Sequence, residues 1–372
     1  MDFYQKKYII KRKPPNMKTI TFQSPGDNIL RDIRNEVAEY FKKNNLKKTG
    51  NTSLYVKSIF MAALLIVPFT LTWSFEVTLL TLCLLSVLSG LGKAGVGMNI
   101  MHDASHGTYS DKKWVNKLVS KLMFLISVHN LNWEQQHNVV HHSHTNIDGH
   151  DTDIESGGLF RFTKEQKWKP GHRFQFLYAV FLYSATTFMR ATYWDFTRLA
   201  RYFRDHPEIP SEEKRKEWIE LIGLRAVYFF FWIGVPILFG VNEWYFAIVF
   251  FLGMHLVSGL VLTVIFQTAH VVPLASTYSA EEEKKSWAHH QLLTTCNFAT
   301  DSGLTSWLLG GLNFQKEHHL LPDVSHVHYR EISWIVRKWC HKNDIRYLEY
   351  PGTWDAVMAH FQLLYNLGKK PI

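Results

Sequence analysis

Eight histidines are the side chains of this sequence most able to do chemistry together, because most of them occur in short, regularly spaced groups. In an α-helix, residues i and i+4 lie on one face, so His102 and His106 can direct both rings at one site. His137 and His141 repeat this spacing, and His142 points about 100° around the helix from His141. A cluster that faces two directions can serve two metal ions. The full set is His102, His106, His137, His141, His142, His270, His318 and His319.

The number of imidazoles narrows the choice of metal. Imidazole nitrogen binds zinc, copper, iron or nickel. Eight ligands exceed the four positions of a zinc site, and the sequence contains no His-Glu-x-x-His motif of the zinc proteases. Two metal ions with about four nitrogen ligands each account for the number. Iron would join such a site to oxygen chemistry at a lipid surface, so we expect an oxygen-using iron enzyme that acts on a lipid.

Four apolar stretches must position these histidines. Each has about the 17 to 25 residues that a membrane-spanning helix needs. A buried core helix is the alternative for any one stretch, but four stretches in two close pairs favour an all-α, polytopic membrane protein. The second and fourth run in the same direction and end just before His102 and His270, so they deliver these residues at the same depth. The stretches are residues 58–75, 77–100, 221–240 and 244–266.

The distribution of charge predicts the orientation in the membrane. The net charge is +9, yet the turns between paired spans, residues 73–76 and 240–244, contain no Lys or Arg. The N-terminal segment and the two long polar segments hold nearly all of the basic residues, which is the positive-inside pattern. We therefore expect an integral membrane protein with both termini and the active site on the cytoplasmic face. The same pattern explains the basic charge without a nucleic-acid partner.

The three cysteines indicate a reducing compartment. Cys83, Cys296 and Cys340 are an odd number and lie far apart. This spacing argues against a disulfide framework, an iron–sulfur cluster and a paired-cysteine zinc site. The first 50 residues contain no apolar stretch followed by a small-residue cleavage site, so we expect no secretory signal peptide.

The chain divides into three parts on this reading. Residues 1–50 are a cytoplasmic tail followed by one amphipathic helix that begins near Asp27. Residues 51–350 form the membrane domain, whose cytoplasmic helical cap comprises residues 101–220 and 267–350. Residues 351–372 are a C-terminal cytoplasmic tail. The apolar stripe of the amphipathic helix consists of Leu30, Ile33, Val37, Tyr40 and Phe41.

Three segments resemble the histidine boxes of the membrane fatty acyl desaturases, in the order typical of that family. They are HDASH at residues 102–106, HNVVHH at 137–142 and QKEHH at 315–319. Gln315 replaces the first histidine of the third box, which resembles the front-end subgroup and similar bacterial acyl-CoA or acyl-lipid enzymes. The flanking sequences are also similar, and the resemblance covers about residues 27–350. These flanks are TN at 145–146, GHDTD at 149–153, QTAH at 267–270 and LLP at 320–322.

The resemblance implies an oxidoreductase with a non-haem di-iron centre held by the box histidines. Such a centre uses dioxygen and two electrons to introduce a double bond into an acyl chain. In relatives the histidine before the third box also binds iron, and this role is carried over to His270. The only His-Pro pair, His206-Pro207, continues as Glu208-Ile209 and not as the Gly-Gly of a cytochrome b5 haem loop. We therefore expect electrons from a separate ferredoxin, or from a free cytochrome b5 with its reductase.

Two neighbours of the ligands are candidates for supporting roles. Asp103 could accept a proton from the second ring nitrogen of a ligand, as metal-bound histidine usually requires. An ordinary surface or capping aspartate is an equally good reading. Gln315 could hold a metal-bound water or support its box, and we favour support. The metal centre itself is the expected catalytic group.

Two other functions remain open from the sequence. A lipid hydroxylase or related di-iron oxidase would use the same centre and differ in whether the product gains a double bond or an oxygen atom. A membrane metal transporter or store would need ionisable ligands along the spans, and of the histidines only His255 lies deep in one. Product analysis distinguishes a hydroxylase from a desaturase. Metal transport that does not depend on oxygen would favour the transporter or store.

Overall fold

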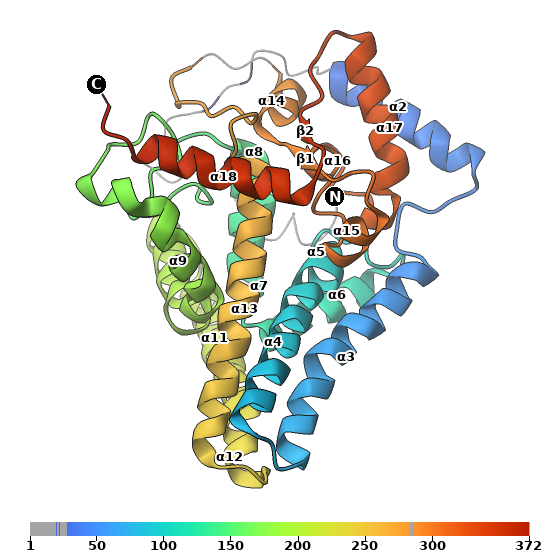
Figure 1. Cartoon of the computed structure of the whole chain (residues 1–372). Coiled ribbons are helices and arrows are strands. Elements are labelled where there is room, and N and C mark those ends of the chain that lie inside the picture. The colour runs from blue at the N-terminus through green and yellow to red at the C-terminus, as the bar shows by residue number, and fades with distance from the viewer. Residues whose placement is uncertain (1–19, 21, 23–27, 283–285, 372) are drawn as a thin grey trace.

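The structure is a computed structural model, and it describes residues 20, 22, 28–282 and 286–371. Most of the predicted N-terminal tail lies outside these residues. In Figure 1 the long helices converge on a narrow end at the bottom, and shorter helices form a broad cap above them. The strands among the described residues are short: β1 (Asn297–Phe298) pairs in parallel with β2 (Glu349–Tyr350). The fold is all-α, as the sequence predicts.

Four helical segments are long and apolar enough to cross a membrane, in agreement with the four predicted spans. They cover Thr52–Ser74, Leu79–Ser105, Ser211–Phe239 and Trp244–His270. Large apolar side chains on their outer faces are exposed, among them Ile59, Leu80 and Phe239. An exposed apolar belt of this kind is stable in lipid and not in water. The elements are α3 (Thr52–Ser74), α4 (Leu79–Val96), η1 (Gly97–Met101), α5 (His102–Ser105), α11 (Ser211–Phe229), η6 (Phe230–Gly234), α12 (Val235–Phe239) and α13 (Trp244–His270).

Small residues allow the spans to pack closely. A Cβ atom on Gly92 of α4 would collide with the backbone of Leu64 and Leu65 in α3. A Cβ atom on Gly259 of α13 would collide with the backbone of Ser184 in α9 (Gln175–Met189). Lipid supplies no hydrophobic drive between spans, so this close backbone packing is a main source of their association. The bundle is thereby rigid enough to present its helix ends to the cap.

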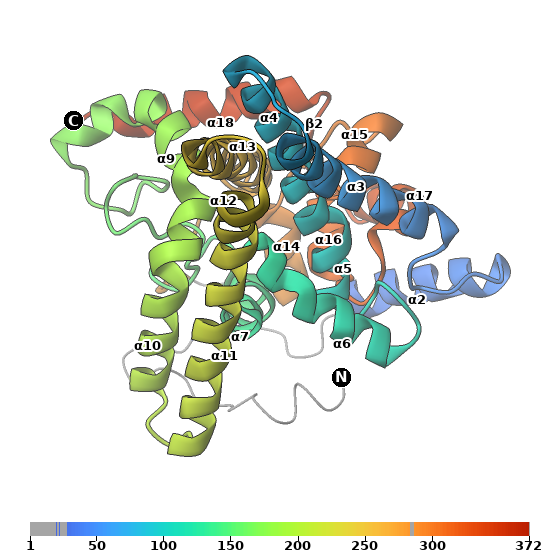
Figure 2. The ribbon, with the colours of Figure 1, turned by 90° about the horizontal axis from the view of Figure 1, so that it is seen from below.

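The segment between the second and third spans forms the first part of the cap. It begins with short helices near the ends of the spans and continues into a helical hairpin. Figure 2 shows that α10 and α11 lie side by side in this hairpin. Its elements, besides α9, are α6 (Lys113–Lys121), η2 (Leu122–Ile126), α7 (Asn130–Trp133), η3 (Glu134–His141), α8 (His142–His144), η4 (Pro170–Phe174), η5 (Arg190–Trp194) and α10 (Asp195–Asp205).

The chain after the fourth span completes the cap, together with the N-terminal amphipathic helix α2 (Asn28–Lys43). The predicted stripe of α2 is correct, since Ile33, Val37 and Phe41 are buried and belong to one apolar cluster with α17. The segment that the sequence divides off as a C-terminal tail contains helix α18, which lies across the cap in Figure 1. The elements here are α14 (Trp287–Thr294), α15 (Gly303–Leu308), α16 (Gln315–Leu320), η7 (His326–His328), α17 (Tyr329–Lys342) and α18 (Thr353–Gly368).

Candidate metal centre

All eight predicted ligands converge where the second and fourth spans enter the cap. One group contains His102, His106, His137 and His318, and a second contains His141, His270 and His319. Within each group, one ring nitrogen from every residue lies within 4.8 Å of the others. His142 lies between the groups and satisfies the same criterion with His318 and His319. The eight rings thus form two neighbouring groups with His142 between them.

The second box differs from the predicted α-helix. Residues Glu134–His141 form a π-helix, and the backbone N–H of His142 bonds to the carbonyl of His137. In this helix residues i and i+5 face each other, so the Nε2 atoms of His137 and His142 lie 3.4 Å apart. His141 is thereby directed to the second group. His137 and His141 still lie close together, with ring centroids 5.6 Å apart, but the π-helix adds the direct approach of His142 to His137 that an α-helix would not give.

Each of the eight histidines has a buried ring nitrogen without a hydrogen-bond partner in the described part of the chain. A buried polar atom left unpaired costs free energy and is rare in folded proteins. A metal ion at each group would satisfy the unpartnered Nε2 atoms, which occur in both groups, so the residues present fit a pair of bound ions. The unpartnered atoms are both ring nitrogens of His102, Nε2 of His106, Nδ1 of His137, Nε2 of His141, Nδ1 of His142, and Nε2 of His270, His318 and His319.

Hydrogen bonds to the opposite nitrogen fix the orientation of four of these rings. Nδ1 of His319 lies 2.9 Å from Oε1 of Gln291, and Nδ1 of His141 lies 3.1 Å from Oδ2 of Asp151. Nδ1 of His318 contacts the Tyr329 hydroxyl at 3.3 Å, and Nδ1 of His270 contacts the carbonyl of Thr294 at 3.4 Å. With Nδ1 engaged, Nε2 is the nitrogen presented to the group. Metal-binding histidines are typically held in this way.

The surroundings keep most of the rings in the neutral form that binds metal. Burial, with smaller contributions from neighbouring imidazoles, holds the pKa of His137, His142, His318 and His319 well below the usual histidine value. Burial lowers the pKa of His106 to about 4. A neutral imidazole has the free lone pair that a metal requires. These five ligands are therefore ready to bind metal at neutral pH.

His141 has two carboxylates beside its ring, those of Asp151 and Asp153. Burial opposes ionisation of Asp151, but His141 and the backbone N–H groups of Asn146 and Asp153 hold its pKa below the usual value. Burial and the adjacent Asp151 raise the pKa of Asp153, whose Oδ1 accepts a hydrogen bond from Gln136 at 2.5 Å. Asp151 is consequently the ionised partner that fixes His141. In the sequence, Asp151 belongs to the flank GHDTD at residues 149–153, which resembles the desaturase family. Nothing in the sequence indicates that it pairs with His141.

The two predicted supporting residues have different surroundings. Asp103 is buried, which excludes the surface reading, but its nearest partners are Ser325 at 2.6 Å and Nδ1 of His326 at 2.9 Å. Its Oδ1 lies 4.0 Å from Nδ1 of His102, too far for a direct hydrogen bond. Gln315 donates to the carbonyl of Leu312 at 2.8 Å, and its Oε1 is buried with no hydrogen-bond partner among the described residues. Both residues thus adjoin ligands without bonding them tightly.

Sequence reasoning missed the charged pair inside the third box. Lys316 is fully buried and donates to the carbonyls of Leu292 at 2.6 Å and Thr295 at 2.5 Å. Glu317 accepts hydrogen bonds from Asn297 at 2.8 Å and Tyr347 at 2.9 Å. These contacts tie α16 to the segments around α14, β1 and Tyr347, and so fix His318 and His319. The available signal was that these charges directly precede two predicted ligands, because such a segment must be buried together with the ligands.

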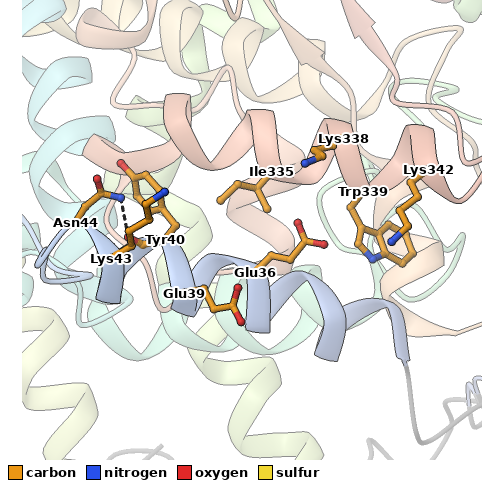
Figure 3. Close-up of a pocket in the computed structure, with 9 residues that line it drawn as sticks. All are labelled: Glu36, Glu39, Tyr40, Lys43, Asn44, Ile335, Lys338, Trp339 and Lys342. Carbon is orange, nitrogen blue, oxygen red and sulfur yellow. Dashed lines mark hydrogen bonds between the residues drawn. The ribbon is translucent and has the colours of Figure 1, made fainter.

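A surface pocket lies away from the histidines, in the groove between α2 and α17 (Figure 3). Its volume is about 760 Å³, and charged side chains of both signs border it. A groove of this polarity does not suit an acyl chain. The residues that line it are Glu36, Glu39, Tyr40, Lys43, Asn44, Ile335, Lys338, Trp339 and Lys342.

Comparison with known proteins gives the same assignment as the geometry. A family model described as fatty acid desaturase matches residues 75–351. An sn-1 linoleoyl-lipid 6-desaturase of Arthrospira platensis is 29% identical over 92% of this chain and 93% of its own length. An sn-1 linoleoyl-lipid 6-desaturase of a Synechocystis species is 28% identical over 91% of this chain and 95% of its own length. An acyl-lipid (8-3)-desaturase of Physcomitrium patens is 30% identical over 90% of this chain and 71% of its own length.

The match includes every element that carries a predicted ligand, from the second span to the third box. The relatives match over almost the whole described structure and not over an isolated motif. The chain belongs to the fatty acid desaturase family, and it is an oxidoreductase that desaturates fatty acyl chains.

Proposed function

We propose that this membrane enzyme introduces a double bond into the acyl chain of a membrane lipid, on the carboxyl side of double bonds already present. The observation that carries the proposal is the pair of histidine groups with unpartnered nitrogens at the cap end of the spans. The lipid form of the substrate is supported by the printed names of the relatives, which describe linoleoyl-lipid 6-desaturases and an acyl-lipid (8-3)-desaturase.

Two iron ions are the proposed cofactors, and His102, His106, His137, His141, His142, His270, His318 and His319 are the proposed ligands. Bound iron would supply the oxidising power by using dioxygen and two electrons. The chain supplies the rest, since Asp151 and Gln291 orient their histidines and the buried surroundings exclude water. The electrons would come from a separate ferredoxin or cytochrome b5 with its reductase. The positive-inside pattern supports placing the centre on the cytoplasmic face.

The test is lipid analysis of a host that expresses the intact enzyme and is supplied with a defined polyunsaturated lipid. We expect a new double bond and no added oxygen atom. His141→Ala should abolish the product because it removes a ligand and uncouples Asp151. His144→Gln, two residues after the same box and outside both groups, is the matched control and should retain the product.

Each other outcome contradicts a distinct part of the proposal. A product with an added hydroxyl would assign the protein to lipid hydroxylation. If the wild type and His141→Ala gave equal amounts of product, the histidine groups would not be needed for the reaction. Purified enzyme without iron, or with equal iron in both proteins, would refute the assigned cofactor.

A further inference from the structure

A second cluster of polar side chains lies inside the span bundle, well below the histidine groups. Lys93 of α4, Tyr228 of α11 and His255 of α13 are fully buried there. The Lys93 Nζ donates to the Tyr228 hydroxyl at 2.9 Å and lies 3.2 Å from Nε2 of His255. The Tyr228 hydroxyl lies 2.7 Å from the same nitrogen. Thr187 of α9 completes the cluster through Nδ1 of His255 at 3.0 Å. Four helices thus meet at one polar point.

Burying these polar groups costs free energy, and the packing of the helices does not require them. No carboxylate in the described part of the chain forms an ion pair with Lys93, so its partners are hydroxyl groups and an imidazole. Ser127, which also contacts Lys93, has a backbone φ of 65°, in the left-handed region that non-glycine residues rarely adopt. Ionisable residues inside a membrane domain and strained backbone both concentrate at functional sites.

Helix irregularities surround the same point. The π-helical segments η1, η5 and η6 begin within four residues after Lys93, Thr187 and Tyr228, respectively. Isolated π-helical turns are rare and are frequent at functional sites. Three helices therefore change their winding next to the polar cluster, which a bundle of regular spans would not need.

The side chains packed between the cluster and the metal centre are apolar. One continuous apolar cluster extends from Met101, which precedes the ligand His102, to Tyr228 and Phe251. Trp133 packs against this cluster and stacks on the ligand His137 with ring centroids 4.5 Å apart. Lys93 precedes His102 by nine residues, which is roughly 14 Å along a helix at about 1.5 Å per residue. An acyl chain with its reacting carbons at the histidines has the apolar surroundings it needs in this direction.

We propose that Lys93, Tyr228 and His255 form a polar floor that stops the methyl end of the acyl chain and so limits the chain length beyond the reacting carbon pair. A methyl group offers no hydrogen bond. A chain that extended past the floor would have to separate Lys93 from its partners and leave buried polar groups unpaired, which is unfavourable. The cluster therefore determines specificity and does not take part in the chemistry. This inference rests on the proposed function.

Acyl chains of one head group that lengthen in steps of two carbons provide the test. Conversion is measured for each chain in membranes containing the wild type or a variant. Lys93→Met removes the ammonium group and keeps a flexible side chain of similar length. It should raise the ratio of long-chain to short-chain conversion about fivefold or more, because one buried polar group no longer has to be unpaired. Tyr228→Phe keeps the ring and should raise the ratio less, in the same direction.

Ser89→Ala is the matched control. Ser89 lies on the same helix and donates a buried hydrogen bond to the Leu65 carbonyl outside the cluster, at 2.8 Å. It should keep the wild-type ratio. Enzyme amount and thermal midpoint are measured for every variant, and Tyr228→Phe decides the result if Lys93→Met does not accumulate.

A common decrease at all chain lengths, or an unchanged ratio, would show that the cluster only holds the helices together and would overturn the inference. A wild type that makes no double bond from any chain would instead refute the proposed function.

Discussion

At the scale of single residues, the orientation of each imidazole decides whether the histidines act as ligands. His141 shows this best, because Asp151 holds its Nδ1 and Nε2 remains unpartnered. Spacing in the sequence identifies the rings that can meet. The partner of the second nitrogen comes from another loop or helix, as with Gln291 for His319. The hydrogen-bond partner of Nδ1 therefore cannot be predicted from the sequence and is seen only in the structure.

Asp151→Asn tests the role of this partner. The amide keeps the volume but cannot supply the negative charge that holds His141, so we expect iron affinity and activity to fall about 10- to 100-fold. The bound iron per protein and the rate of desaturation are the measurements. Asp148→Asn is the matched control, because Asp148 lies in the same loop and accepts a hydrogen bond from Gln166 at 2.9 Å. Equal iron content in both variants would contradict the assigned role.

The histidine groups could be predicted from the sequence to a large extent, because the ligands follow directly after spans or lie in short boxes. The π-helix at residues Glu134–His141 could not be predicted. The π-helical hydrogen-bond pattern depends on how the second box packs against the other histidines. The helix propensity of its own residues does not determine it. Lys93 was missed for a related reason, since one lysine within an apolar stretch carries no periodic signal. The hydroxyl groups that offset its burial belong to Ser127 and Tyr228, which lie 34 and 135 residues further along the chain.

At the scale of helices, close backbone contact between spans positions the ligands. Gly92 lies where α4 packs on the backbone of α3, and α4 leads directly to His102 through η1. A methyl group at this position cannot be accommodated by rotation of a side chain, because the atoms it meets belong to the backbone. The helix axes would have to separate, and the ligand at the end of α4 would move with them.

Gly92→Ala should therefore destabilise the enzyme by about 1 to 3 kcal/mol, the usual cost of overpacking. The thermal midpoint of the detergent-purified protein and its iron content should both decrease. Gly223→Ala is the control, since nothing lies within 4 Å of a Cβ atom at Gly223 in α11. Alanine there should be neutral or stabilising by up to about 1 kcal/mol, because it lowers the entropy of the unfolded chain. A similar loss in both variants would refute the close contact of α3 with α4.

Helix α18 has a pH-sensitive attachment to the bundle. His360 is buried, its Nδ1 lies 2.8 Å from the Val271 carbonyl, and the Tyr183 hydroxyl lies 3.0 Å from its Nε2. Burial lowers the pKa of His360 to about 4, below the ordinary value of 6.5. The unfolded chain then binds a proton that the folded chain excludes, so stability falls as the pH decreases from about 6.5 toward 4. Above that range His360 contributes no pH dependence.

His360→Gln retains a donor and an acceptor but does not titrate. Between about pH 7.5 and about pH 5, the wild type should lose about 2 kcal/mol more unfolding free energy than this variant, from 1.36 kcal/mol per pKa unit. Thermal midpoints of both proteins at the two pH values measure the difference. Parallel pH dependences would show that another group dominates the acid sensitivity of this region.

At the scale of the whole molecule, the topology determines where the chemistry happens. Four spans with short turns leave both large segments and α2 on one side of the bundle, where Figure 1 shows the cap. The histidines at the ends of α13 and of the second span face this side. Of the described residues, the opposite end contains the turns that connect α3 to α4 and α12 to α13. The positive-inside pattern predicts that the capped side is cytoplasmic.

Single introduced cysteines test this orientation with a thiol reagent that cannot cross membranes. Glu243 is exposed in the turn before α13, and Lys342 is exposed at the end of α17 in the cap. Lys342→Cys should be labelled only when the cytoplasmic face is accessible, as in inverted vesicles, and Glu243→Cys only in vesicles of the opposite orientation. The wild type provides the background, since Cys296 and Cys340 are buried and Cys83 lies within a span. The reverse pattern would place the metal centre outside the cytoplasm and exclude a cytoplasmic electron donor, whereas labelling of both positions from one face would contradict the four-span topology itself.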